Sequence, residues 1–165
     1  MSHVHKISPN LWFDTQAEEA AEFYTGIFPN SKVNRIARYP EAGEEIHKMT
    51  PGSIMTVDFE LDGQSFVALN AGPVFKFNEA ISFVVHCDTQ QEVDDFWEKL
   101  GAGGDPKANQ CGWLKDKFGV SWQIVPTILT TLLMDPNPNK AASVFGAMLK
   151  MQKLDITALE RAAEG

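Results

Sequence analysis

The spacing of apolar residues predicts that the chain opens with a strand and a helix. Residues 7–13 carry the pattern of a strand, although Pro9 favours an edge position or an irregular start. Residues 17–28 then place apolar side chains at helical spacing. Thr15 is the predicted N-cap of this helix, because Glu18 follows three residues later as in a capping box.

Three further strands are expected before the middle of the chain, with a polar loop over residues 40–52 between the first and second. Asp62-Gly63 lies between the second and third strands, and such a turn is a strong hairpin signal because it requires positive φ. The three strands are predicted at residues 32–39, 53–61 and 64–70.

The same order of elements recurs downstream. A strand over residues 81–87 precedes a helix capped by Thr89 and ended by the glycines from Gly101. A last hairpin is expected around Phe118-Gly119. A second strand for this unit is poorly marked between residues 105 and 111.

Two short sequence repeats support a duplication within the chain. Asp14-Thr15-Gln16 matches Asp88-Thr89-Gln90 in front of each helix, 74 residues later, and residues 63–67 resemble residues 119–123, 56 residues later. The second copy is therefore the shorter, and each copy is too small to bury a core comfortably alone. We expect a βαβββ module at 1–73, a second at 74–127 with a shared cleft between them, and a helical tail at 128–165.

The tail has two amphipathic helical segments, the second capped by Asp155. Their apolar faces must pack either against the body of the chain or against another subunit.

The composition of the chain argues against some classes of binding partner. The 165 residues carry a formal charge of −8, which argues against binding nucleic acid or an anionic membrane through a broad positive field. The apolar runs are too short to span a bilayer. Only Cys87 and Cys111 are present, and the start lacks an apolar signal core, so a cytoplasmic protein is expected.

Familiar catalytic motifs are missing from the sequence. It contains neither a Gly-x-Ser-x-Gly elbow nor the glycine patterns that bind phosphates or dinucleotides. No metal-binding spacing joins the histidines, which are His3, His5, His47 and His86. They are interpreted as surface or capping residues, and no catalytic residue is assigned.

Polar and indole side chains on otherwise apolar strands are the more unusual feature. Such groups either form hydrogen bonds within the core or line a cavity, and the pattern leaves both alternatives open. Aromatic walls with a few polar groups suit a small, partly apolar or aromatic ligand. The candidate ligand-binding residues are Asn10, Trp12, Phe59, Asn70, Ser82, Trp113 and Gln123.

Several segments resemble PhnB-like proteins of the glyoxalase/bleomycin-resistance/extradiol-dioxygenase group, the vicinal oxygen chelate superfamily. The resemblance implies an α+β fold, in which two βαβββ modules form mixed sheets around a cleft, and often a homodimer. The segments that carry it are residues 10–14, 17–24, 59–64, 81–83 and, most strongly, 113–126, and the resemblance is expected to include residues 151–162 of the tail.

Metal-dependent members of that superfamily place His or Glu ligands on the first and last strands of each module. Aligned on the paired motifs, those positions fall approximately at Ser8, Ala68, Ser82 and Gln123. These side chains do not supply the imidazole and carboxylate donors that such a metal needs. We therefore expect neither a catalytic metal nor another cofactor.

Two hypotheses follow. The first is a metal-free protein that binds or sequesters a small molecule, in the manner of the superfamily's resistance proteins. The second is an enzyme, either the demethylubiquinone methyltransferase that PhnB-like proteins are often labelled or a metal-dependent lyase or dioxygenase. The sequence lacks an evident acid/base pair, which favours the first.

Overall fold

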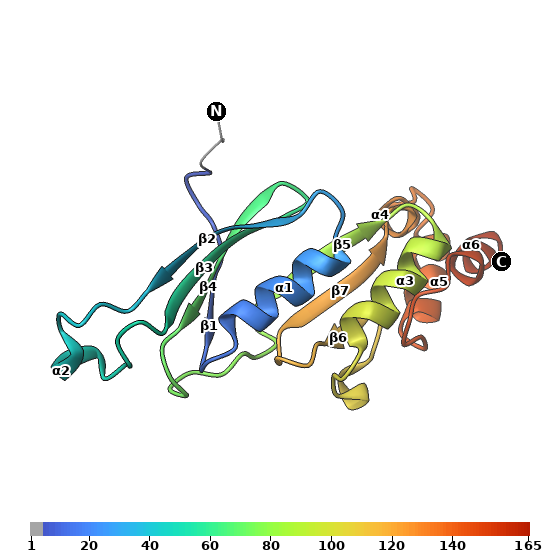
Figure 1. The fold of residues 1–165 in the computed structure, drawn as a ribbon. Coiled ribbons are helices and arrows are strands. Elements are labelled where there is room, and N and C mark those ends of the chain that lie inside the picture. Colours follow the sequence, from blue (N-terminus) through green and yellow to red (C-terminus); the bar gives the residue numbers. More distant parts are fainter. Residues whose placement is uncertain (1–4) are drawn as a thin grey trace. The chain divides into compact units, whose positions relative to one another are not determined.

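The computed structural model describes residues 5–165, so His3 lies outside the described residues. It forms two compact units, one ending at Lys76 and the other comprising Phe77–Gly165. Each unit contains a β-sheet with a helix packed along one face (Figure 1). The predicted α+β class with two mixed sheets and C-terminal helices is confirmed.

The first unit has a four-stranded sheet in the order β1-β4-β3-β2. β1 runs parallel to β4, whereas β4–β3 and β3–β2 are antiparallel. The polar loop predicted over residues 40–52 contains one short helix, α2. The elements are β1 (Asn10–Phe13), α1 (Ala17–Ile27), β2 (Lys32–Arg38), α2 (Glu44–His47), β3 (Ile54–Leu61) and β4 (Gln64–Asn70).

The core of this unit lies between α1 and the sheet. Tyr24 of α1 is fully buried and stacks on Phe59 of β3, with ring centroids 6.3 Å apart. Phe59 stacks in turn on Phe66 of β4 at 5.3 Å. Buried aromatic rings contribute large apolar areas and add a geometric preference, so this stack fixes the position of α1 on β3 and β4.

The predicted cap of α1 was wrong, whereas the predicted hairpin is confirmed. Gln16 rather than Thr15 is the N-cap, and it makes no side-chain cap hydrogen bond. The Asn70 side chain instead accepts a hydrogen bond from the backbone N–H of Ala17 at 2.8 Å. A partner distant in sequence thus satisfies an N–H that capping boxes satisfy locally. Asp62 and Gly63 have φ of 48° and 78°, as the hairpin requires.

The second unit has a three-stranded sheet in the order β5-β7-β6, with β5 parallel to β7 and β6 antiparallel to it. A second strand was expected between residues 105 and 111, and this prediction was wrong. That segment forms a single 3-10 turn, η1, and then a tight turn with positive φ at Cys111 and Gly112. The elements are β5 (Ser82–Cys87), α3 (Gln90–Gly101), η1 (Pro106–Ala108), β6 (Trp113–Lys115) and β7 (Ser121–Pro126).

Local signals in the second unit are confirmed. The Thr89 side chain caps α3 by accepting a hydrogen bond from Glu92 N at 3.2 Å. Buried Asp116 organises the β6–β7 turn, because its carboxylate accepts from the N–H groups of Phe118 and Val120 and from the Trp122 indole at 2.8–3.0 Å.

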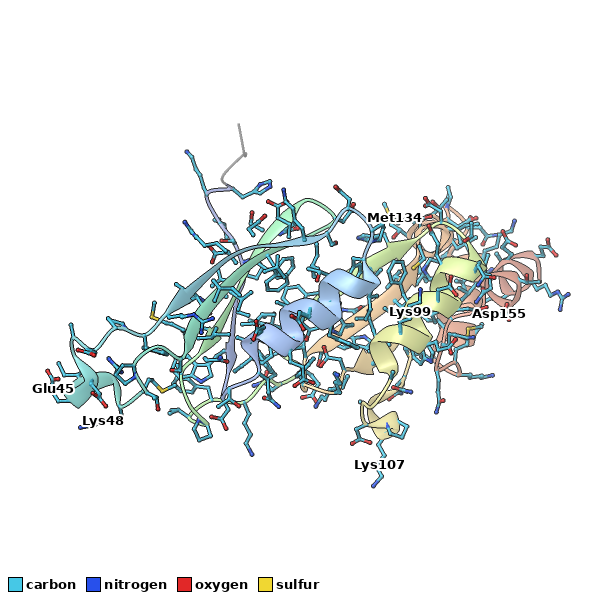
Figure 2. All side chains as sticks on the ribbon, in the orientation of Figure 1. Glu45, Lys48, Lys99, Lys107, Met134 and Asp155 are labelled. Atoms are coloured by element: carbon cyan, nitrogen blue, oxygen red, sulfur yellow. The ribbon has the colours of Figure 1, made fainter. Side chains whose placement is uncertain are left out.

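The tail buries part of its apolar surface within the second unit, against the body of the chain. Its helices are α4 (Thr127–Leu133), α5 (Pro138–Met148) and α6 (Ile156–Glu164). Met134 follows α4, and Asp155 caps α6 as predicted (Figure 2). The buried cluster comprises Leu129, Val144, Leu154 and Leu159. Among the described residues, every helix is too short or too polar to cross a bilayer.

Candidate functional site

Strand alternation gives each sheet a face covered by its helix and an opposite face, which is called the open face. In the first sheet, Leu11 and Phe13 of β1 are buried on the covered face, whereas Asn10 and Trp12 lie on the open face. Asn10 is directly opposite Val67 of β4, so the open face continues across the sheet. Two of the predicted ligand-binding residues are therefore neighbours on one accessible surface.

The Trp12 ring is held in one orientation. Its indole N–H donates to the Gly72 carbonyl at 2.9 Å, and the Phe75 ring meets it edge-on with centroids 4.8 Å apart. Phe75 is itself 62% exposed. An ordered indole beside an exposed phenyl ring is a surface on which a planar apolar molecule can pack.

A pocket of about 570 Å³ lies on the open face of the first sheet. Arg35 and Asp58 face each other across β2 and β3 with a 2.5 Å ion pair, and both line this pocket. Val67 lines it as well, which places the pocket beside Asn10. The other lining residues are His5, Ser8, Lys32, Asn34, Phe59, Glu60, Ser65 and Phe66.

The Phe59 ring and the Asn70 amide do not lie with Asn10 and Trp12 on the open face, although Phe59 is among the residues that line the pocket there. The Phe59 ring is 1% exposed and packs in the core beneath α1. The Asn70 amide is occupied by Ala17 N and by the Ile54 carbonyl, which accepts from Asn70 Nδ2 at 3.3 Å. The Asn70 amide thus has hydrogen-bond partners within the fold, and the Phe59 ring has packing partners in the core.

The open face of the second sheet collects the other three candidates. Ser82, Gln123 and Trp113 come from adjacent strands, with Trp113 directly opposite Gln123. The Gln123 side-chain amide donates to the Ser82 hydroxyl at 2.9 Å. Polar contacts and an indole ring thus occupy the same sheet face, the combination that a small-molecule site uses.

The pKa is lowered for an exposed carboxylate, Glu79, and raised for a buried thiol, Cys87. The hydrogen bond from Lys115, together with its positive charge, lowers the pKa of Glu79. Burial, assisted by the charges of Glu92 and Asp88, raises the pKa of Cys87 to about 12. The Cys87 thiol is therefore neutral at ordinary pH and is a packing group rather than a nucleophile.

The donor set does not fit a superfamily-type metal. Ala68 is fully buried on the covered face, and Gln123 bonds Ser82. No three His, Cys, Asp or Glu side chains within residues 5–165 are placed to hold an ion. A common site for a nucleotide-like methyl donor is a glycine-rich turn between a strand and a helix. The turns before α1 and α3 are instead Asp14-Thr15-Gln16 and Asp88-Thr89, which contain no glycine.

Sequence reasoning missed two residues on the second open face, Lys115 and Ser121. Ser121 is two positions before Gln123, so strand alternation alone could have identified it. Lys115 needed the register of β6 against β7, which pairs it with Ser121. The pocket residues Arg35 and Asp58 were missed for the same reason, because pairing across β2 and β3 places them together.

Comparison with known proteins agrees with this architecture. Residues 5–125 match the family described as 3-demethylubiquinone-9 3-methyltransferase. The PhnB protein of Bacillus cereus shares 35% identity over 74% of this chain and 100% of its own, with a TM-score of 0.63. Protein PA1353 of Pseudomonas aeruginosa shares the fold at 20% identity and a TM-score of 0.57, over 74% of this chain and 97% of its own. No curated protein matches. The chain therefore belongs to the PhnB-like, 3-demethylubiquinone-9 3-methyltransferase family, as the resemblance predicted.

Proposed function

We propose that this protein binds a small, partly apolar or aromatic molecule on the open faces of its sheets without a metal. Each sheet face is a candidate binding surface by itself: Asn10 and Trp12 are the candidate contacts in the first unit, and Ser82, Trp113 and Gln123 are those in the second. The observation that carries the proposal is the ordered Trp12 indole, held by Gly72 and Phe75 at the surface of an otherwise open sheet face. A pre-oriented ring loses little entropy when a planar ligand packs on it.

A thermal-shift screen of quinones, aromatic thiol conjugates and antibiotics tests this function. A binding compound at a hundredfold excess over its Kd stabilises the fold by about 2.7 kcal/mol, which raises Tm measurably. Trp12→Phe, Asn10→Ala and Trp113→Phe should reduce that shift. Trp97→Phe, on α3, is the matched control and should leave it unchanged. If no compound in these classes shifts Tm, the binding proposal fails.

The family's description supports one alternative, an enzyme that transfers a methyl group. Such an enzyme must bind a methyl donor, so titration calorimetry with S-adenosylmethionine distinguishes the two functions. Micromolar binding would favour the methyltransferase. The metal-dependent lyase or dioxygenase alternative has less support, because Ser8, Ala68, Ser82 and Gln123 are poor ligands.

A further inference from the structure

Three side chains form one row across the open face of the second sheet. Ser121 at the start of β7 is directly opposite Ser82 of β5 on one side and Lys115 of β6 on the other. Directly opposite residues on neighbouring strands have Cβ atoms about 5 Å apart. The next row holds Gln123 and Trp113, so a polar row lies beside an indole.

Ser121 has an unexplained hydroxyl within this row. The residue is 2% exposed, and its Oγ has no hydrogen-bond partner. A buried hydroxyl without a partner is costly, and such groups in native proteins usually have a functional or structural reason. Gln123 does not satisfy it, because that amide donates to Ser82 instead.

Lys115, on the strand next to Ser121, carries a positive charge. Its ammonium pairs with Glu79, whose side chain is 62% exposed. Exposed ion pairs contribute little to stability, so a competing anion can replace Glu79 at small cost. Because Lys115 is directly opposite Ser121, an anion held by its ammonium in place of Glu79 can also accept a hydrogen bond from the Ser121 hydroxyl.

We propose that Lys115 and Ser121 form an oxyanion subsite that orients an aromatic ligand lying against Trp113. This inference rests on the proposed function and deepens it by assigning the ligand an acidic group, a carboxylate or a phosphate. Trp113 and Lys115 are two residues apart on one strand, a spacing of about 7 Å. A benzene ring with an attached acid spans a comparable length.

NMR titration of the ¹⁵N-labelled full chain tests the subsite with benzoate, phenyl phosphate, inorganic phosphate and uncharged benzamide. The reporters are the Ser121 amide and the Trp113 indole N–H, the latter assigned from Trp113→Phe. We expect at least one aromatic anion to shift both signals and to bind about tenfold or more tightly than benzamide, as a hydrogen bond to a charged group provides. The relative effects of benzoate and phenyl phosphate identify the acid preferred.

Variants distinguish binding at this subsite from a general effect of positive charge on anion binding. Ser121→Ala and Lys115→Gln should each weaken binding of the preferred anion about tenfold, whereas Glu79→Gln should tighten it by freeing the ammonium. Lys99→Gln removes the same charge from α3, on the covered side of the sheet, and should have no effect (Figure 2). A dispersed spectrum for each variant shows that it is folded.

Two results would overturn the subsite. The first is an unchanged Kd for the aromatic anions in Ser121→Ala, which would make the hydroxyl a mere packing defect. The second is benzamide binding as tightly as benzoate and phenyl phosphate. In that case aromatic binding, and with it the proposed function, would survive without the oxyanion subsite. Absence of any shift at Trp12 and Trp113 with every aromatic probe would count against both.

Discussion

Two asparagines of the first unit show how burial separates structural from functional roles at the residue scale. Asn70 is 6% exposed, and its amide joins the start of α1 to the start of β3. The Tyr39 hydroxyl also donates to the Asn70 carbonyl at 2.5 Å. Asn10 instead lies exposed on the open face. The same residue type therefore stabilises the fold at one position and is available to a ligand at the other.

Replacement of Asn70 should be destabilising. Asn70→Ala leaves Ala17 N–H and the Ile54 carbonyl without their partner, and we expect the free energy of unfolding to fall by about 2 kcal/mol. Asn70→Asp keeps the acceptor for Ala17 and should lose less. Urea denaturation measures both, with Asn10→Ala as the control that stays within about 0.5 kcal/mol of wild type. Equal stability of Asn70→Ala and Asn10→Ala would contradict the assignment.

The two cysteines should differ in reactivity. The pKa of Cys87 is raised to about 12 and its side chain is buried, whereas Cys111 is partly exposed. An aromatic disulfide reagent at pH 8 should therefore modify Cys111 in the native protein and Cys87 only after denaturation. Mass spectrometry of the labelled peptides gives the site.

The same raised pKa predicts a dependence of stability on pH. The fold favours the neutral Cys87 thiol, so its contribution is complete below the unfolded pKa near 9.0 and declines as pH rises towards 12. Cys87→Ala should show a shallower alkaline loss of stability than wild type. Rapid native labelling of Cys87 at pH 8 would contradict both expectations.

At the scale of elements, Gln90 links the first turn of α3 to the tail. Its side chain donates to the Leu154 carbonyl at 3.1 Å and accepts from the backbone N–H of Ile156, the first residue of α6, at 2.8 Å. The Met151 and Gln152 carbonyls accept from Cys111 N and Gly112 N at 2.8 and 2.7 Å. The family match covers residues 5–125 and does not include the resemblance expected over residues 151–162. These hydrogen bonds nevertheless join the tail to the matched part of the second unit.

Gln90→Ala should loosen this attachment while leaving the sheet intact. We expect faster amide hydrogen exchange over residues 154–164, because the Leu154 and Ile156 backbone groups lose their partner. Exchange within β5 and β7 should be unchanged. Gln91→Ala is the matched control, since Gln91 bonds only Asp95 on the same exposed helix surface. Uniformly faster exchange would mean that Gln90 supports the whole unit instead.

At the scale of the whole molecule, both units share one topological plan. In each, the first strand runs parallel to the last, and a helix covers the sheet. The two repeated sequence segments, residues 63–67 and 119–123, lie at equivalent places. Each begins with a glycine of positive φ, Gly63 or Gly119, in the turn before the last strand of its sheet. This agreement supports duplication, whereas the division into 1–73, 74–127 and 128–165 stays a prediction.

A homodimer is the expected assembly. Phe145 and Leu149, one turn apart on and just after α5, are 50% and 49% exposed, and such apolar pairs favour burial against a partner. Light scattering should give about 37 kDa, twice the 18.3 kDa chain. Phe145→Ser should lower that mass if this surface is used. A mass near 18 kDa across micromolar concentrations would exclude the dimer.

The sequence by itself determined the features whose causes are local. The Asp62-Gly63 hairpin, the Thr89 cap and the bounds of β4 follow from turn chemistry, capping and alternation over a few residues. Alternation also placed Asn10 with Trp12 on one strand face. The fold class and the family followed from the order of these elements and from the motifs they carry.

Only the tertiary structure decided which face of each strand is covered. Phe59 and Asn70 alternate as regularly as Trp12, but α1 packs on their side of the sheet and buries them. The cap of α1 by Asn70 and the row of Ser82, Ser121 and Lys115 likewise join residues far apart in the chain. Such contacts depend on strand register and helix placement, and these are set by packing over the whole unit rather than by any local pattern.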